Sequence, residues 1–362
     1  MLRETYPEAL YIDLLDTSTL FKLTNQPSKL RSILDSRNKV QLELPVIIDE
    51  VQKVPSLLDE VHKAIEEKGA QFLLCGSSAR KLKRSQANLL GGRAWRYELH
   101  PLVYKEIPNF DLIKALNAGL IPNHYLSDSS YKLSLEGYVA DYLQEEIRAE
   151  GLSRNLPAFT RFLEAAGFSH GELVNYKNVA KDCAINAKTA KEYFQILEDT
   201  LVASLIYPFS RSTISRKDMY HTPKFYFFDS GVASFLRGFS FSKLSEKEVG
   251  HIFEGFILHE IIAWRSYTKQ RFDIRFWRRS EQLEVDFVLN RGAIAIEAKI
   301  SSQLRSDDLV GLKTFVQDYK PKKAIVVCNE PYERHVHLTE DSTIHVIPWT
   351  LFIERMWEGS LF

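Results

Sequence analysis

Short apolar runs alternate with helix-like stretches through the first third of the chain, and this alternation limits the possible folds more than any other feature. Residues 9–14, 44–49 and 71–76 have the composition of buried strands. Between the last two, residues 57–68 carry apolar side chains at helical spacing. Strand–helix–strand order is typical of a parallel sheet covered by helices, so we expect an α/β domain here.

The middle of the chain is predominantly helical. A short helix over residues 176–182, a turn of small residues at 183–186 and a second helix over 187–197 give the outline of a helix-turn-helix. Two strand-like runs, 202–208 and 224–228, follow and are suited to form a wing. We therefore expect a winged-helix domain in this segment.

The pattern changes again after residue 250. A helix leads into a group of strands, a second helix and further strands, which indicates another α/β domain. The predicted helices span residues 251–267 and 307–317, and the predicted strands span 272–277, 284–289, 293–298, 324–328 and 345–348.

The length of 362 residues favours several domains over one. We expect a multi-domain α/β protein whose domains cover residues 1–125, 126–240 and 241–362. Lys and Arg number 47, as do Asp and Glu, so any nucleic-acid binding must come from local basic patches. The three cysteines share no metal-ligand spacing, and no signal peptide or membrane-crossing run is evident. These features predict a cytoplasmic protein with reduced thiols and no membrane partner.

Two adjacent acids follow the second predicted strand. Asp49 and Glu50 would lie at the carboxyl edge of the sheet, where open α/β sheets bind ligands. In a nucleotide site, Asp49 would hold Mg²⁺ through its water shell and Glu50 would polarise the attacking water. The alternative is a strand that ends in two solvated acids.

Three further residues fit the same hypothesis. Ser77 and Ser78 follow the next strand and are suited to sense a γ-phosphate. Arg93 follows a predicted helix and is suited to act as a finger on the nucleotide of a neighbouring subunit, which would require a homo-oligomer. The alternative for Arg93 is an ordinary surface arginine.

Together these motifs resemble the prokaryotic AAA ATPases that carry a DUF4143-type C-terminal region. The resemblance implies a P-loop NTPase-like sheet that binds ATP. Such proteins normally begin with a phosphate-binding loop, but G-x-x-x-x-G-K-[ST] occurs nowhere in this sequence, so the sheet is incomplete at its N-terminus and we expect little ATP hydrolysis. A truncated product, a misassigned start and a degenerate scaffold remain open explanations. The matching residues are 48–52, Pro55, 74–78, Gly92, Arg93, 99–102, 171–175, 189–193 and 223–231.

A local basic set marks the second helix of the helix-turn-helix. Lys188, Thr189 and Lys191 lie at its beginning, where a recognition helix would contact a duplex. The set predicts nucleic-acid binding. The alternative is a winged helix used for packing, with its lysines on a solvated face.

The C-terminal segment places two acids and a lysine on neighbouring strands. Glu297 and Lys299 point to one face of a strand, and a short turn brings Asp286 beside them. Glu254, on the preceding helix, is placed to complete the cluster. Asp286 and Glu297 would hold Mg²⁺, the ion would activate water, and Lys299 would orient it.

This spacing is similar to that of the PD-(D/E)xK nucleases, which implies a restriction-endonuclease-like α/β domain. Such domains also persist as inactive modules, and an exposed ion pair between Glu297 and Lys299 is a further alternative. The sequence therefore predicts an AAA ATPase-related, nucleic-acid-associated protein with a Mg²⁺-dependent nuclease-like site. A non-catalytic DNA- or protein-binding regulatory module and a truncated pseudo-enzyme are the alternatives.

Overall fold

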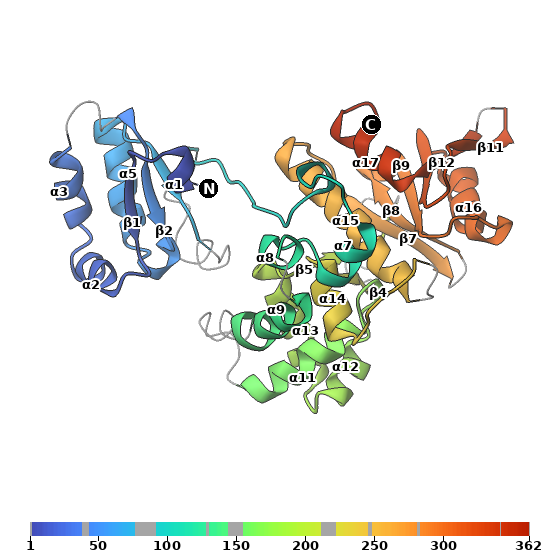
Figure 1. Cartoon of the computed structure of the whole chain (residues 1–362), viewed down its shortest axis with the longest axis horizontal. Helices are drawn as coiled ribbons and strands as arrows, with labels where there is room; N and C mark the ends of the chain where they lie inside the picture. Colours follow the sequence, from blue (N-terminus) through green and yellow to red (C-terminus); the bar gives the residue numbers. More distant parts are fainter. Residues whose placement is uncertain are drawn as a thin grey trace. The chain divides into compact units, whose positions relative to one another are not determined.

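The structure is a computed structural model that describes residues 2–37, 43–76, 92–127, 130–143, 155–210, 222–244, 248–280, 283–340 and 342–361 (Figure 1). It divides into two compact units. The first comprises Met1–Arg96 with Asp199–Leu201, and the second comprises Tyr97–Glu198 with Val202–Phe362. Within the described residues, no helix is both long enough and apolar enough to cross a membrane.

The first unit contains the parallel sheet that the sequence predicted. Its three strands are ordered β1-β2-β3, and both pairings are parallel. The elements are α1 (Leu2–Thr5), β1 (Leu10–Asp13), α2 (Thr17–Asn25), α3 (Lys29–Asp35), β2 (Val46–Asp49), the 3-10 turn η1 (Val51–Lys53), α5 (Leu57–Lys68) and β3 (Phe72–Leu74).

A separate apolar core holds this sheet to its helices. Val46 and Ile48 of β2 pack in one cluster with Leu57 and Val61 of α5, and all four are buried. Their spacing puts the α5 residues on one helical face. The helix ends at Gly69, whose φ of 63° closes it in the left-handed region that glycine adopts readily.

The first half of the second unit is helical, with one small sheet. The sheet is antiparallel and ordered β4-β6-β5. The elements are η3 (Tyr104–Glu106), α7 (Leu112–Ala118), α8 (Pro122–Tyr125), α9 (Tyr131–Gly137), the π-helical η4 (Tyr138–Leu143), α11 (Leu156–Gly167), β4 (Glu172–Leu173), α12 (Tyr176–Asp182), α13 (Ala187–Asp199), β5 (Ala203–Ile206), β6 (Lys224–Phe227) and α14 (Ser230–Leu236).

The predicted helix–turn–helix elements are present as α12 and α13. Ala184 makes the turn between them with a φ of 53°, and the Asn186 side chain accepts a hydrogen bond from the Thr189 amide in the first turn of α13. Small antiparallel strands accompany the two helices, as predicted. Assignment of this arrangement to the winged-helix fold stays a prediction.

Residues 229–231, which follow β6, hold α14 against α7 through hydrogen bonds and close packing. The Asp229 carboxylate accepts hydrogen bonds from the amides of Leu120 (2.6 Å) and Val232 (3.0 Å). The Ser230 hydroxyl donates to a carbonyl of α7 at 2.7 Å. A Cβ on Gly231 would lie 2.3 Å from the α7 backbone, so the two helices approach closely only because this position is glycine.

The second half of this unit is built on a six-stranded mixed sheet ordered β11-β12-β10-β9-β8-β7. The pairings β9–β10 and β10–β12 are parallel, and the others are antiparallel. The elements are α15 (Val249–Tyr267), β7 (Ile274–Ser280), β8 (Leu283–Leu289), η6 (Asn290–Gly292), β9 (Ile294–Lys299), η7 (Ser306–Leu309), α16 (Val310–Tyr319), β10 (Lys323–Cys328), β11 (Arg334–Thr339), β12 (Ser342–Pro348) and α17 (Trp349–Trp357).

Helices cover this sheet on both faces (Figure 1). Helices α15 and α17 pack against β9, β10 and β12, whereas α16 packs against β8 and β9 in a separate apolar cluster on the other face. Strand β10, predicted as a strand over residues 324–328, is central and almost wholly buried. Strand β11 was not predicted. The mixed sheet confirms a second α/β region, and a nuclease-like fold stays a prediction.

Candidate functional site

Strands β8 and β9 bring the two predicted C-terminal carboxylates together. The strands pair antiparallel with Phe287 opposite Ile296, and the next step along this register sets Asp286 opposite Glu297. The Ala298 amide donates to Asp286 Oδ2 at 3.0 Å, and the Asp286 amide approaches Glu297 Oε2 at 3.4 Å. Both acids are buried, so they form one cluster inside the protein.

A lysine that the sequence analysis did not single out lies at the centre of this cluster. The Lys224 ammonium, on β6, is 2.8 Å from Glu254 Oε1 and 3.2 Å from Asp286 Oδ1, and it also forms an ion pair with Glu284. Only 3% of Lys224 is exposed. Glu254, on α15, is therefore in the predicted cluster, and Lys224 joins three carboxylates from α15 and β8.

Two other side chains complete the surroundings of Glu254. The Tyr226 hydroxyl, from β6, donates a hydrogen bond to Glu254 Oε1. His251, one turn before Glu254 on α15, places Nδ1 3.7 Å from Glu254 Oε2 and Nε2 3.1 Å from Glu172 Oε1. Strand β6 and helix α15 are thus joined by hydrogen bonds and by charge.

Lys299 pairs with Glu297 as the two-residue spacing predicted. The Lys299 ammonium is 2.7 Å from Glu297 Oε1. The Lys299 side chain is 36% exposed, but Glu297 is buried, so the pair is not the fully exposed one considered as an alternative. The acids of the cluster therefore face two ammonium groups, one deeply buried and one at the surface.

Burial and charge shift the pKa values of these groups in opposite directions. Burial raises the pKa of Asp286 well above its usual range, and the neighbouring Glu254 and Glu297 add to the rise. Burial also raises the pKa of Glu297, although Lys299 opposes it. Crowded buried carboxylates favour the protonated form, and Lys224 and Lys299 oppose this rise in pKa only in part.

The pKa values of Lys224, Glu254 and His251 shift in the directions that favour their charged forms. Burial alone would lower the pKa of Lys224, but Glu254 and the other acids outweigh it and raise that pKa well above its usual range. Burial would raise the pKa of Glu254, but Lys224 and His251 outweigh it and hold that pKa below its usual range. Hydrogen bonds to Glu172 and Glu254 raise the pKa of His251 to about 9. Lys224 and Glu254 are therefore both charged near neutral pH.

A magnesium ion would have to compete with Lys224 in this cluster. Of its two predicted ligands, Asp286 already contacts the Lys224 ammonium through Oδ1, and Glu297 is paired with Lys299. The ammonium places a single positive charge among the oxygens that a divalent cation would ligate in a nuclease. We therefore assign no metal-dependent step to this arrangement.

Glu260, further along α15 than Glu254, lies outside this cluster. Its Oε1 accepts a hydrogen bond from the Tyr104 amide at 2.7 Å, and its Oε2 accepts one from Trp357 Nε1 at 3.0 Å. Burial raises the pKa of Glu260 to about 7. Glu260 therefore links α15 to η3 and α17.

In the first unit, Asp49 and Glu50 follow β2 as predicted. Asp49 accepts hydrogen bonds from the Tyr11 hydroxyl and, at 3.1 Å, from the Glu50 amide. Glu50 has a φ of 57° and accepts a hydrogen bond from Gln52 Nε2 at 2.7 Å. Both carboxylates thus have partners within the unit, and their roles toward Mg²⁺ and nucleotide stay predictions.

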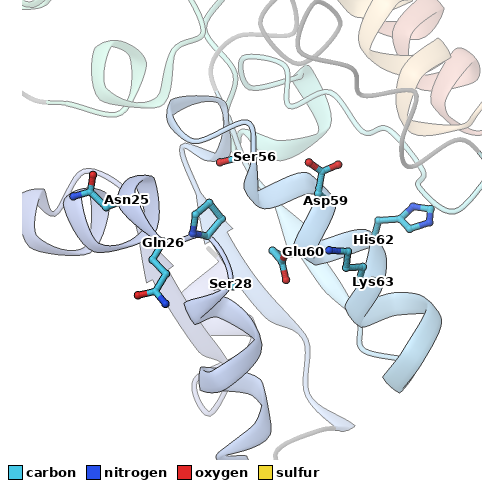
Figure 2. A pocket seen from close by; sticks show the side chains of 9 residues that line it. Asn25, Gln26, Ser28, Ser56, Asp59, Glu60, His62 and Lys63 are labelled. Carbon is cyan, nitrogen blue, oxygen red and sulfur yellow. Dashed lines mark hydrogen bonds and ion pairs between the residues drawn. The ribbon is translucent and has the colours of Figure 1, made fainter.

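The other predicted nucleotide-site residues are not gathered around these acids. Arg93 forms an ion pair with Glu66 of α5, and both side chains are well exposed. Ser77 and Ser78 lie outside the residues that the structure describes. A polar groove of about 520 Å³ lies instead between the α2–α3 turn and α5, lined in part by Asp59 and His62 (Figure 2). None of the predicted site residues lines it.

The predicted nucleic-acid-binding residues lie in the first turns of α13. Lys188 and Lys191 are exposed, and Thr189 is half-buried. The opposite face of α13 is apolar and packs into the core through Ala190 and Phe194. The two lysines are therefore available to a partner.

Comparison with known proteins gives three family matches along the chain. A model described as an AAA domain matches residues 1–108, a domain of unknown function named DUF8612 matches 109–243, and the domain of unknown function DUF4143 matches 249–352. An AAA domain followed by a DUF4143 region makes this an AAA-family ATPase-like protein with a DUF4143 C-terminal region. The family resemblance read from the sequence is thereby confirmed.

Two curated relatives extend the comparison. They are uncharacterized proteins of Mycobacterium bovis and Mycobacterium tuberculosis, each 23% identical to this chain over 247 residues. Each match covers 67% of this chain and 55% of the relative, so the chain spans about half the length of these relatives. No solved structure matches.

Proposed function

We propose that this AAA ATPase-related protein is a nucleic-acid-associated regulatory module whose nuclease-like acidic cluster is held closed by Lys224 and is not catalytic in this form. The observation that carries the proposal is the buried Lys224 ammonium, in contact with Glu254, Glu284 and Asp286. A catalytic centre of the PD-(D/E)xK type would use Asp286 as a ligand of the divalent ion, and Oδ1 of Asp286 is in contact with this ammonium. Of the functions considered from the sequence, a non-catalytic binding module fits this arrangement best.

A cleavage assay tests the proposal. Linear and branched DNA are incubated with the protein in Mg²⁺ and in Mn²⁺, with Asp286→Ala as the matched variant. We expect no metal-dependent cleavage above the background of Asp286→Ala. Cleavage by the wild-type chain that Asp286→Ala abolishes would overturn the proposal and favour an active nuclease in which Lys224 moves away.

Nucleic-acid association is supported by the exposed lysines of α13. Lys188 and Lys191 lie at the beginning of the second helix of a helix–turn–helix arrangement, which is the end that contacts bases and phosphates in duplex-binding proteins. Because the overall charge is balanced, affinity for nucleic acid has to come from a local basic set of this kind. A gel-shift series across salt concentrations tests it, and no binding at low salt would count against it.

We propose that the AAA domain of this chain, taken by itself, turns over little or no ATP. Asp49 and Glu50 supply acids at the carboxyl edge of the sheet, but the sequence contains no G-x-x-x-x-G-K-[ST] to grip phosphates. Titration with a fluorescent ATP analogue tests this directly, and micromolar binding would contradict it. Light scattering with and without ATP tests whether the chain assembles into a homo-oligomer. In such an assembly, Arg93 would leave its ion pair with Glu66 and contact the nucleotide of a neighbouring subunit.

A further inference from the structure

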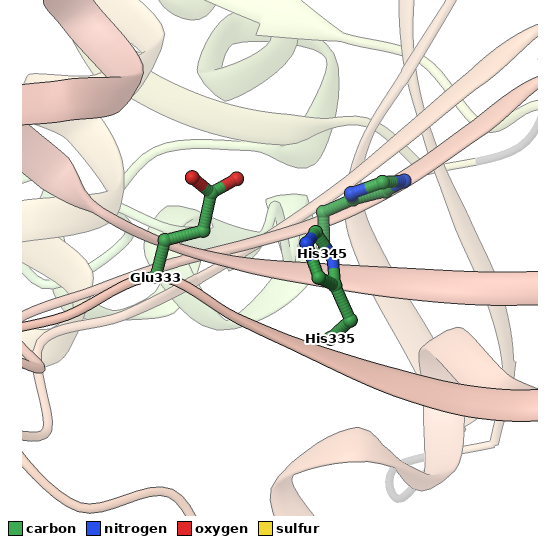
Figure 3. Close-up of side chains that lie close together, drawn as sticks. All are labelled: Glu333, His335 and His345. Atoms are coloured by element: carbon green, nitrogen blue, oxygen red, sulfur yellow. The ribbon is translucent and has the colours of Figure 1, made fainter.

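A second cluster of metal-ligating side chains lies at the edge of the six-stranded sheet, where β11 pairs antiparallel with β12. His335 on β11 stands directly opposite His345 on β12. Their ring centroids are 4.8 Å apart and the rings are nearly perpendicular (Figure 3). Directly opposed residues of an antiparallel pair share one face of the sheet, so both imidazoles are available to one ligand.

Glu333 adds a carboxylate to this pair. It precedes His335 by two residues, the spacing that puts side chains on the same side of an extended chain. One ligand atom from each of Glu333, His335 and His345 lies within 4.8 Å of the others. Tetrahedral bonds of about 2.0–2.1 Å to an ion place its ligand atoms about 3.4 Å apart, so a small side-chain rotation closes the site.

The two imidazoles are free to act as ligands. In residues 283–340 and 342–361, neither His335 nor His345 makes a hydrogen bond or an ion pair. Their rings contact each other, and the charges of Glu333 and Arg355 act on His345. A neutral imidazole nitrogen is a common ligand of transition-metal ions.

Arg355 of α17 fixes the carboxylate. Its two terminal nitrogens are 2.9 Å and 2.8 Å from the Oε1 and Oε2 atoms of Glu333. Hydrogen bonds of this kind orient carboxylate ligands at metal centres. The positive charge of Arg355 also weakens attraction for any cation, so the two imidazoles must supply most of the affinity.

We propose that Glu333, His335 and His345 form a binding site for a divalent transition-metal ion of the zinc class. Two imidazoles and one carboxylate are a donor set that suits zinc, whereas magnesium and calcium prefer oxygen ligands alone. Three protein ligands leave one tetrahedral position for water or an exogenous ligand. The ion would bridge β11 and β12 at the exposed edge of the sheet.

The proposal is tested with Co²⁺ as a spectroscopic probe of the full chain and Zn²⁺ as its competitor. We expect one equivalent of Co²⁺ to give the visible absorption of a tetrahedral site, without a thiolate charge-transfer band, and Zn²⁺ to displace it. His335→Ala and His345→Ala should each weaken binding at least tenfold. His337→Ala is the matched control, since His337 is the next exposed histidine of β11 and contacts Thr343 instead.

The proposal would be overturned if neither Co²⁺ nor Zn²⁺ bound to the chain. It would also be overturned if His335→Ala and His345→Ala left the affinity for the ion unchanged, or if His337→Ala weakened that affinity as much as they do. A thiolate band would instead point to the half-buried Cys75 of the first unit as the ligand. Far-UV circular dichroism of each variant separates loss of the ligand from loss of the fold.

Discussion

The ammonium of Lys224, on a strand of the small antiparallel sheet, lies 3.2 Å from Oδ1 of Asp286, on a strand of the six-stranded sheet. The contact joins the helical half of the second unit to its C-terminal half through a buried charge. Lys224 also contacts Glu254 and Glu284, so three carboxylates share one buried ammonium.

Replacing Lys224 by methionine should destabilise the protein strongly. The change keeps the aliphatic volume but leaves Glu254, Glu284 and Asp286 without their shared cation. Removing one partner of a buried ion pair costs about 3–5 kcal/mol. Urea unfolding at pH 7 measures the effect. Lys299→Met is the matched control and should cost about 1 kcal/mol, because its side chain is 36% exposed. Equal losses for the two variants would contradict the central role of Lys224.

The stability contributed by His251 should fall at alkaline pH. Hydrogen bonds to Glu172 and Glu254 raise the pKa of His251 to about 9, from an ordinary value of 6.5. A group whose pKa is higher in the folded protein than in the unfolded chain stabilises the fold fully at pH values below the unfolded-state pKa. This stabilisation is lost as the pH rises through the folded-state pKa. Relative to His251→Gln, the wild type should be about 1–2 kcal/mol more stable at pH 6, since the side chain is 38% exposed and partly screened. The difference should approach zero at pH 10. A difference that grows with pH would contradict the assigned ion pairs.

Alanine at position 231 should destabilise the packing of α14 on α7. The added Cβ would lie 2.3 Å from the backbone of Ala118, so the two helices would have to move apart. Overpacking of this kind costs about 1–3 kcal/mol or more. Gly250→Ala is the matched control, because a Cβ there meets nothing within 4 Å and alanine favours the helix. Thermal unfolding should show a lower midpoint for Gly231→Ala alone.

Neutralising the exposed lysines of α13 should weaken nucleic-acid binding without changing the fold. If Lys188 and Lys191 each contact a phosphate, the double alanine variant should reduce the slope of log K against log salt by about 2. Lys22→Ala, an exposed lysine of α2, is the control and should leave the slope unchanged. A double variant that binds like the wild type at every salt concentration would place the contact elsewhere.

Much of the fold could be predicted because its signals are local. The strands β1, β2 and β3 are short apolar runs, and Glu297 and Lys299 of β9 have the two-residue spacing that puts both on one face. Strand β11 was not predicted, because only Val336 and Leu338 among its six residues are apolar. It is an edge strand with alternate residues exposed, and such strands need few apolar side chains.

The candidate site was predicted only in part, because Lys224 acts at long range. Its partners Glu254 and Asp286 are 30 and 62 residues away along the chain, and no local pattern links them. One signal was present. A lysine that opens the apolar strand Lys224–Phe227 is unusual, since buried lysines occur almost only where they are paired. Arg93 and Glu66, by contrast, meet in an exposed pair that no sequence rule distinguishes from a solvated arginine.

The most direct test of the closed site is the effect of Mg²⁺ on thermal unfolding of the wild type and Lys224→Met. We expect millimolar Mg²⁺ to leave the wild-type midpoint unchanged, because the ammonium holds the oxygens that the ion needs. It should raise the midpoint of Lys224→Met by about 2–4 °C for each kcal/mol of binding, and Asp286→Asn in that background should remove the gain. A rise in the wild-type midpoint that Asp286→Asn abolishes would show that the ion binds with Lys224 in place, and would contradict the closed site.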